Sequence, residues 1–151
     1  MKGPLFYSKI LLFGEYGIIE DSKGLSIPYN FFNGALKFSK VNTKDSKKSN
    51  KILLQFHNYL SGIHNLELDL SKFEKDLRKG IFFDSSIPQG YGVGSSGAIV
   101  AAVYDKYALN KIKISENLNR NKLVDLRNIF SQMESFFHGK SSGLDPLNSY
   151  L

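Results

Sequence analysis

The spacing of apolar residues divides the chain into strand-like segments first and helical segments later. Short apolar runs predict strands over residues 8–13, 18–19, 25–29 and 35–41. Asn33-Gly34 is typical of a tight hairpin turn and predicts that the last two of these strands form a hairpin. The alternating residues Leu66, Leu68 and Leu70 predict one further strand.

Apolar residues at helical spacing predict helices over residues 52–63, 96–109 and 115–137. Residues 72–79 are charged and short, which indicates a turn or a small helix. The lysine-rich stretch 37–51 has no aromatic residue after Phe38, so it favours a solvated hairpin or mobile loop over a nucleic-acid surface. Strands followed by helices predict an α+β domain with helices on one face of a sheet.

A glycine-rich segment stands directly before the most apolar of these helices. Gly90, Gly92 and Gly94 alternate, and Ser95 and Ser96 follow them at the start of the helix. Glycines let the backbone approach a ligand closely, and a helix N-terminus presents unpaired N–H groups with a favourable dipole. The segment therefore predicts a polyphosphate-binding loop. The two serines can cap the helix or offer a hydroxyl to a phosphate-bound metal ion.

Three other kinds of glycine-rich segment have similar sequences. A P-loop requires a lysine that is missing here, because none lies between Lys79 and Lys106. Gly92, Gly94 and Gly97 satisfy the dinucleotide pattern, but no strand precedes its acidic candidate, Glu116. The third alternative, a glycine-rich turn that binds no ligand, stays open.

Two carboxylates near the end of the chain form a second candidate constellation. Glu134 lies on the last predicted helix, and Asp145 follows eleven positions later in a Gly- and Ser-rich loop. Such residues can converge on one site, where phosphoryl transfer needs one carboxylate for Mg²⁺ and one for the attacking hydroxyl. The alternatives are a solvated helix residue for Glu134 and a turn residue before proline for Asp145.

Composition narrows the class of protein without deciding the function. The 151 residues are 42% hydrophobic and 13% aromatic, enough for one folded domain. The absence of cysteine excludes disulfides and thiolate metal sites and fits a reducing cytoplasm. No apolar run approaches a membrane span. A net charge of +6 suits an anionic ligand such as a nucleotide, and also nucleic acid.

Three separated segments together resemble the N-terminal region of the galactokinase, homoserine kinase, mevalonate kinase and phosphomevalonate kinase (GHMP kinase) superfamily. Residues 9–19 resemble its first motif, and residues 88–98 resemble its phosphate loop, Pro-x-Gly-x-Gly-Leu-Gly-Ser-Ser-Ala. Residues 134–145 are similar to the pattern Glu-x-x-x-His-Gly-x-x-Ser-Gly-x-Asp, with the spacing of mevalonate kinases. The resemblance covers the chain from about Lys9 to its end.

The resemblance implies a role for each matching residue. Asp145 would be the catalytic base, and Lys9 would lie beside the path of the phosphoryl group. Ser96 and Glu134 would hold Mg²⁺. The acceptor would be contacted by Glu15, Tyr16, Ser142 and Gly143. ATP would be bound by Pro88, Gly90, Gly92, Val93, Gly94, Ser95, Ser96, Gly97 and Ala98.

The fold implied by the resemblance is that of ribosomal protein S5 domain 2, a twisted, mostly antiparallel sheet with helices on one face. The implied activity is ATP- and Mg²⁺-dependent phosphorylation of a primary alcohol, with mevalonate, an isoprenoid precursor, as the favoured acceptor. Phosphomevalonate and homoserine are the enzymatic alternatives, and a non-catalytic nucleotide- or RNA-binding S5-like domain is the alternative of another class. We expect no nucleic-acid or membrane partner, and a homodimer of the intact protein stays open.

Two positions depart from the family pattern. Tyr16 replaces the usual histidine of Gly-Glu-His, which affects recognition of the acceptor, and Gly97 replaces the usual alanine. The family's third Gly-rich motif and C-terminal domain are absent from residues 1–151, so we expect these residues to be an N-terminal, ATP-binding domain of a longer protein. By themselves they should be inactive, because half of the cleft is missing.

Overall fold

The computed structural model describes residues 3–13, 25–41, 43–114 and 118–151. Glu15, Tyr16, Glu116, the predicted strand 18–19 and the predicted start of the last helix at residue 115 lie outside the described residues. The elements, in chain order, are β1 (Phe6–Phe13), β2 (Leu25–Phe38), α1 (Lys44–Ser61), α2 (Leu70–Arg78), β3 (Ile81–Ser85), α3 (Ser95–Tyr107), α4 (Arg120–His138) and α5 (Leu144–Tyr150).

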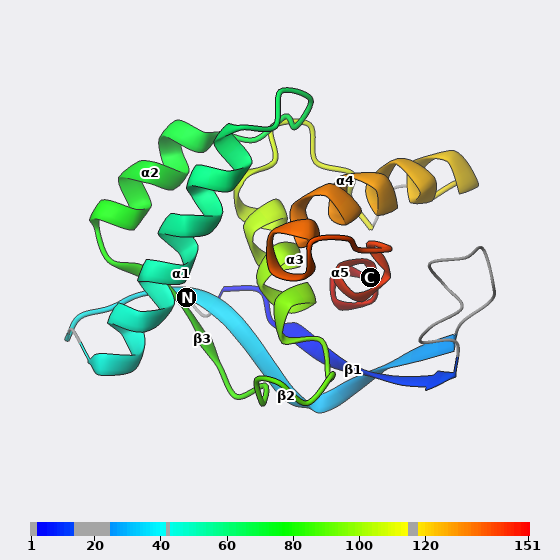
Figure 1. Cartoon of the computed structure of the whole chain (residues 1–151), viewed down its shortest axis with the longest axis horizontal. Coiled ribbons are helices and arrows are strands. Elements are labelled where there is room, and N and C mark those ends of the chain that lie inside the picture. The colour runs from blue at the N-terminus through cyan, green and yellow to red at the C-terminus, as the bar shows by residue number, and fades with distance from the viewer. Residues whose placement is uncertain (1–2, 14–24, 42, 115–117) are drawn as a thin grey trace.

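The sheet of the described residues has three strands in the order β1-β2-β3, and both neighbouring pairs are antiparallel. Figure 1 shows the helices on one side of this sheet, with α3 and α5 above β1 and β2 and with α1 above β3. The α+β class and the antiparallel sheet are therefore confirmed, whereas the detailed likeness to ribosomal protein S5 stays a prediction.

The predicted hairpin at Asn33-Gly34 is wrong, because β2 runs without a turn from Leu25 to Phe38. Gly34 pairs with Phe6 on one side and with Ser85 on the other, so it lies in the central strand. A Cβ on Gly34 would come within 2.2 Å of the Phe83 ring. The close approach of an aromatic ring therefore explains the glycine. The local sequence alone does not distinguish such a glycine from one in a hairpin turn.

The lysine-rich stretch was predicted as a solvated hairpin or mobile loop, but residues 44–51 form the first turns of α1. Thr43 caps this helix, since its Oγ1 accepts a hydrogen bond from the Ser46 amide at 3.1 Å. The inward face here is polar: Asn50 Nδ2 donates to the Ile81 carbonyl at 2.6 Å, and Ser49 Oγ accepts from the Phe83 amide at 2.9 Å. These contacts cover the edge of β3 with polar side chains. The sequence of this part of α1 therefore lacks the apolar stripe from which a helix is predicted.

The strand predicted from Leu66, Leu68 and Leu70 is also wrong. Leu68 makes a single isolated bridge to Ala108, and Leu70 is already the first residue of α2. Asp69 ends the extended segment because its side chain accepts a hydrogen bond from the Lys72 amide at 2.9 Å and caps α2. The charged segment 72–79 therefore belongs mostly to a helix.

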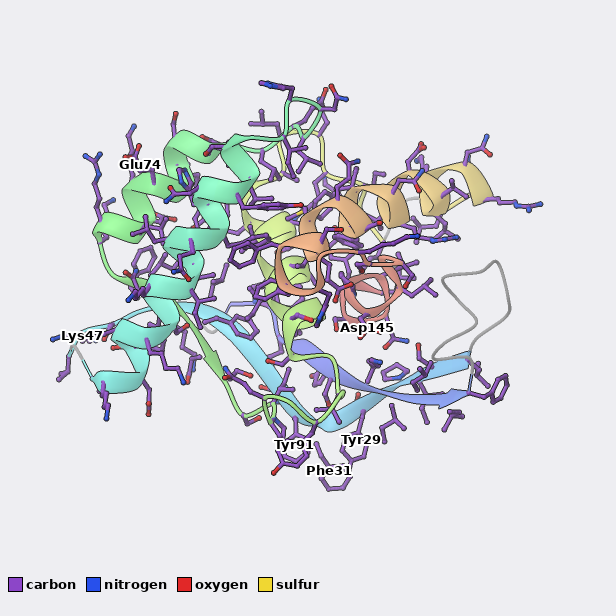
Figure 2. The ribbon with its side chains drawn as sticks, in the orientation of Figure 1. Tyr29, Phe31, Lys47, Glu74, Tyr91 and Asp145 are labelled. Carbon is purple, nitrogen blue, oxygen red and sulfur yellow. The ribbon has the colours of Figure 1, made fainter. Side chains whose placement is uncertain are left out.

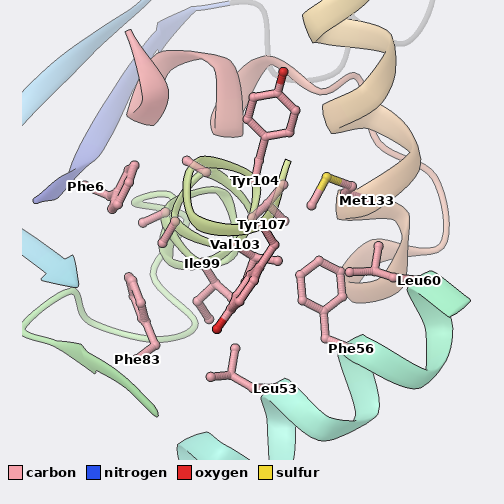
Figure 3. Packing of buried hydrophobic residues seen from close by; sticks show 14 of the residues in the cluster. Phe6, Leu53, Phe56, Leu60, Phe83, Ile99, Val103, Tyr104, Tyr107 and Met133 are labelled. Atoms are coloured by element: carbon pink, nitrogen blue, oxygen red, sulfur yellow. The ribbon is translucent and has the colours of Figure 1, made fainter. Parts of the chain in front are cut away.

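Helix α3 is the centre of the hydrophobic core, as its small apolar residues predict. Figure 3 shows Ile99, Val103 and Tyr107 of α3 surrounded by side chains from β1, α1, α4 and β3. The remaining two predicted helices also form, as the second half of α1 and as α4. Helix α5 was not predicted. Its Pro146 lies in the first turn, where the missing N–H has no helical partner to lose.

The other side of the sheet carries exposed aromatic residues. Figure 2 shows Tyr29 and Phe31 of β2 beside Tyr91 of the glycine-rich segment, below the sheet. The rings of Tyr29 and Phe31 are stacked with centroids 5.2 Å apart, and Phe31 and Tyr91 are each 80% exposed. Among the described residues, none of the helices is both long and apolar enough to span a bilayer.

Candidate active site

A cavity of about 850 Å³ lies where the glycine-rich segment meets the end of α4 and the start of α5. Pro88, Gly90 and Gly94 line it together with Glu134 and Asp145. Residues of β1 and of the start of β2 complete the lining, among them Lys9, Leu11, Leu25 and Ser26. Segments from both ends of the chain therefore form one site.

The glycine-rich segment has the backbone that a close approach to a ligand requires. Gly90, Gly92 and Gly94 have φ of 82°, 68° and 83°, values that side chains with a Cβ rarely adopt. Gly94 is the N-cap of α3, and no side chain caps this helix. Ser95 and Ser96 are its first residues, so of the two roles predicted for the serines, capping is wrong. The first residues of α3 line the cavity, and the backbone N–H groups at a helix start have no partner within the helix.

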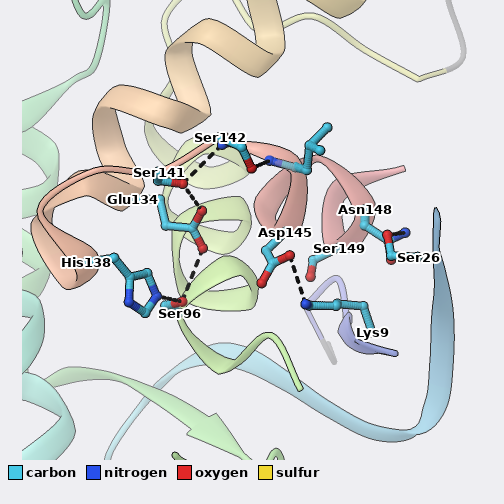
Figure 4. Close-up of polar contacts among 12 residues, drawn as sticks. Lys9, Ser26, Ser96, Glu134, His138, Ser141, Ser142, Asp145, Asn148 and Ser149 are labelled. Carbon is cyan, nitrogen blue, oxygen red and sulfur yellow. Dashed lines mark hydrogen bonds and ion pairs between the residues drawn. The ribbon is translucent and has the colours of Figure 1, made fainter. Parts of the chain in front are cut away.

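Lys9 ties the glycine-rich segment to the end of the chain. Its amide donates to the Val93 carbonyl at 3.1 Å, and its stem passes so close to Gly94 that a Cβ there would lie 2.9 Å from Lys9 Cγ. Its Nζ lies 3.0 Å from Asp145 Oδ1 (Figure 4). The lysine side chain is 6% exposed and that of Asp145 is 33% exposed. The pair thus places a buried positive charge beside a carboxylate that is accessible from the cavity.

Glu134 faces inward, contrary to the alternative of a solvated helix residue. It is 3% exposed and accepts hydrogen bonds from Ser96 Oγ at 3.1 Å and from Ser141 Oγ. Burial raises the pKa of Glu134 to about 7, while the hydrogen bond from Ser141 acts in the opposite direction. Nearby Asp145 raises the pKa further and Lys9 lowers it, so the two predicted carboxylates share one electrostatic environment.

Of the predicted site residues that the structure describes, three do not line the cavity. Ala98 is fully buried in α3, and Gly97 packs against the start of α5, where a Cβ would lie 2.7 Å from the Asp145 carbonyl carbon. Gly143 has a φ of 74° and packs against α4, where a Cβ would come within 2.2 Å of the Arg127 carbonyl oxygen. Ser142, by contrast, lines the cavity. The two glycines hold α5 close to α3 and α4, which sets the position of Asp145.

Sequence reasoning assigned no role to several polar residues that the structure places in the site. His138 Nε2 lies 2.9 Å from Ser96 Oγ, and its position one helical turn after Glu134 was the available signal. No feature of the sequence indicated that Ser141 belongs to the site. Asn148 Nδ2 donates to Ser26 Oγ at 3.0 Å across the other end of the cavity. Within the described residues, the Asn148 Oδ1 atom is buried without a hydrogen-bond partner.

The raised pKa of Glu134 predicts how the stability of the metal-free protein depends on pH. The folded protein holds the Glu134 proton up to about pH 7, whereas the ordinary value is 4.5. The group therefore destabilises the fold increasingly as pH rises from 4.5 to 7, by on the order of 3 kcal/mol at most. Glu134→Gln should remove this loss, so the variant should be more stable than the wild type at pH 8 and similar to it at pH 4.5.

Urea unfolding in the presence of a chelator measures this difference. Glu74→Gln is the matched control, because the Glu74 side chain is 48% exposed and paired with Arg78 on the surface. Stability curves of wild type and Glu134→Gln that stay parallel from pH 4.5 to pH 8 would show that Glu134 is not a buried titrating group.

The family described as "GHMP kinases N terminal domain" matches residues 54–150, which include the phosphate-loop segment, Glu134 and Asp145 but not Lys9. No curated protein and no solved structure matches the chain significantly. The matched region covers more than half of the chain, and the chain belongs to the GHMP kinase family of small-molecule kinases.

Proposed function

We propose that this protein transfers the γ-phosphoryl group of ATP to a primary alcohol, with Asp145 as the catalytic base. The observation that carries the proposal is the convergence of two pairs on one cavity. Lys9 and Asp145 form one pair, 3.0 Å apart, and Ser96 and Glu134 form the other, 3.1 Å apart. A domain that only bound a nucleotide would not need the second carboxylate.

The glycine-rich segment is the proposed site for the phosphates of ATP. Its positive-φ glycines leave the backbone free of side chains on the cavity side, and no Cβ at Gly90 or Gly92 would meet an atom within 4 Å. The uncapped start of α3 adds oriented N–H groups and the positive end of a helix dipole. Ser95 and Ser96, the first two residues of α3, both line the cavity beside these N–H groups.

The residues present fit a magnesium ion. Ser96 and Glu134 offer hydroxyl and carboxylate oxygens, the ligand types that Mg²⁺ prefers, and two protein ligands suffice where phosphates and water supply the others. Burial and the nearby Asp145 raise the pKa of Glu134, and a divalent cation beside this carboxylate would favour its ionised form. A bound Mg²⁺ would offset the negative charge of the phosphates and help to orient them. No described group of three or more His, Cys, Asp or Glu residues suggests another metal centre.

Asp145 has the geometry to orient an alcohol and to accept its proton. Its Oδ1 contacts Lys9 Nζ, so its other oxygen can receive the hydroxyl of an acceptor that enters from the cavity. The ammonium of Lys9 also lies where it can offset negative charge that develops during transfer. A carboxylate and an ammonium fixed in this way need little reorganisation during the reaction.

The acceptor is the least constrained part of the proposal. Mevalonate is favoured by the spacing from Glu134 to Asp145, and phosphomevalonate and homoserine are the alternatives. Leu11, Leu25, Ser26 and Asn148 also line the cavity, and an acceptor with a short carbon chain would fit beside them. Release of ADP by the full-length protein, measured with mevalonate, phosphomevalonate, homoserine and galactose, tests the assignment. Nucleotide binding without turnover of any acceptor would favour a non-catalytic domain.

Replacing Asp145 by asparagine should lower kcat strongly while ATP still binds. A general base contributes on the order of 10²–10⁴ in rate, and asparagine keeps the shape of the side chain but cannot accept the proton. Asp84→Asn is the control, since the Asp84 side chain is 49% exposed and pairs with Lys37 of the neighbouring strand. The measurement combines kcat with an ATP-binding isotherm. Near wild-type turnover would place the base elsewhere, and loss of ATP binding would make Asp145 structural.

Gly97→Ala should displace Asp145 without adding any polar group. The new Cβ would lie 2.7 Å from the Asp145 carbonyl carbon and 2.9 Å from the Pro146 nitrogen, and both are backbone atoms. We expect kcat to fall by on the order of 10²-fold, because small displacements of a reacting group are costly. Stability should fall by about 1–3 kcal/mol through overpacking.

The control for this variant is Gly62→Ala, at the end of α1, where φ is −85° and the nearest atom to a new Cβ lies at 3.4 Å. Both kcat and the free energy of unfolding are measured for the two variants. If Gly97→Ala retained the kcat and the stability of the wild type, contact between α3 and α5 would not position Asp145.

A further inference from the structure

The proposed cation-binding pair lies inside a longer chain of hydrogen bonds. Figure 4 shows His138, Ser96, Glu134 and Ser141 connected in that order. His138 Nε2 lies 2.9 Å from Ser96 Oγ, Ser96 Oγ donates to Glu134 Oε1 at 3.1 Å, and Ser141 Oγ donates to Glu134 Oε2. The two outer residues, His138 and Ser141, also line the cavity but have no assigned role.

The hydroxyl of Ser96 can bind a cation only if its hydrogen points elsewhere. A cation contacts a lone pair of the oxygen, so the O–H bond has to be directed to an acceptor on another side. Two acceptors are within reach, Glu134 Oε1 and His138 Nε2. When Glu134 turns its lone pairs to the same cation, His138 Nε2 is the acceptor that stays available. The nearer of the two acceptors in this structure is also His138.

Ser141 restricts Glu134 in a comparable way. Its hydroxyl oxygen accepts a hydrogen bond from the Gly143 amide at 3.0 Å, which directs its own hydrogen toward Glu134 Oε2. The backbone of Ser141 is held as well, since its carbonyl accepts from Ser131 Oγ at 2.6 Å. With Oε2 fixed by Ser141, Oε1 is the oxygen that faces Ser96. The loop between α4 and α5 therefore sets the orientation of the carboxylate.

We propose that His138 and Ser141 are positioning residues for the cation site, with His138 orienting the Ser96 hydroxyl and Ser141 orienting the Glu134 carboxylate. The inference rests on the proposed function, because it assumes that Ser96 and Glu134 hold a divalent cation beside a bound nucleotide. Residues that orient metal ligands typically change metal affinity by about 10–100-fold when they are removed.

Binding of Mn²⁺ to the full-length protein saturated with ADP, followed by electron paramagnetic resonance, tests the proposal without turnover. His138→Leu and Ser141→Ala should each weaken Mn²⁺ binding by about 10–100-fold. His138→Gln and Ser141→Thr keep a side-chain acceptor and a hydroxyl, respectively, and should retain most of the affinity. His64→Leu and Ser135→Ala are the controls: His64 is exposed, and Ser135 Oγ donates to the Ser131 carbonyl away from the cavity.

Two further measurements separate positioning from a general structural effect. In the kinase assay, excess Mg²⁺ should restore most of the kcat of His138→Leu and Ser141→Ala, because the defect lies in cation affinity. In nitrogen-15 spectra of the metal-bound protein, His138 should carry its proton on Nδ1, since Nε2 accepts from Ser96.

The possible results distinguish this inference from the function on which it rests. If the wild type binds no Mn²⁺ in the presence of ADP, the proposed cation site itself is wrong. If the wild type binds Mn²⁺ and His138→Leu and Ser141→Ala bind it equally well, only the positioning roles are wrong. A proton on Nε2 of His138 in the metal-bound protein would overturn the role of His138 alone.

Discussion

The ion pair between Lys9 and Asp145 joins the first strand of the chain to its last helix, and the site depends on it. A buried ammonium group is costly unless an anion compensates it, and Asp145 lies 3.0 Å away. The same lysine donates its amide to Val93 and passes against Gly94. One residue of β1 therefore fixes both the glycine-rich segment and the start of α5 relative to the sheet.

The second requirement is that three helices approach one another closely around this ion pair. Gly97 lets the first turn of α3 contact the backbone of Asp145, and Gly143 lets the loop before α5 contact α4. Bulkier residues at either position would separate the helices that carry Ser96, Glu134 and Asp145. In this chain the departure from alanine to glycine at position 97 has a geometric reason, because α5 lies too near for a methyl group.

The sequence was informative where the chemistry is local and less so where it depends on distant contacts. Apolar residues at helical spacing predicted α3, and the alternating glycines predicted a loop that can approach a ligand closely; all three glycines have positive φ. Gly34 was mistaken for a turn residue because the ring of Phe83 that explains it lies on another strand. The first half of α1 was missed because its inward face uses polar side chains, Ser49 and Asn50, to bind β3.

In the candidate site, too, local motifs could be predicted from the sequence, whereas contacts between distant segments could not. Glu134 and Asp145 were selected by residue type and spacing, Ser96 by its place at a helix start, and Lys9 by the family resemblance. The structure places all four around one cavity, while their roles stay predictions. The contacts of Ser141 and Asn148 could not be predicted, since they depend on how α5 packs against α4 and β2.

The central claim is that these residues form a single phosphoryl-transfer site. A crystal structure of the full-length protein with Mn²⁺ and a non-hydrolysable ATP analogue tests it most directly. We expect an anomalous peak for Mn²⁺ within about 2.0–2.3 Å of Ser96 Oγ and a Glu134 oxygen, as for a tightly held octahedral ion. The γ-phosphate should face Asp145, and the triphosphate should follow the glycine-rich segment. A metal ion bound away from Glu134, or a triphosphate outside this cavity, would contradict the account.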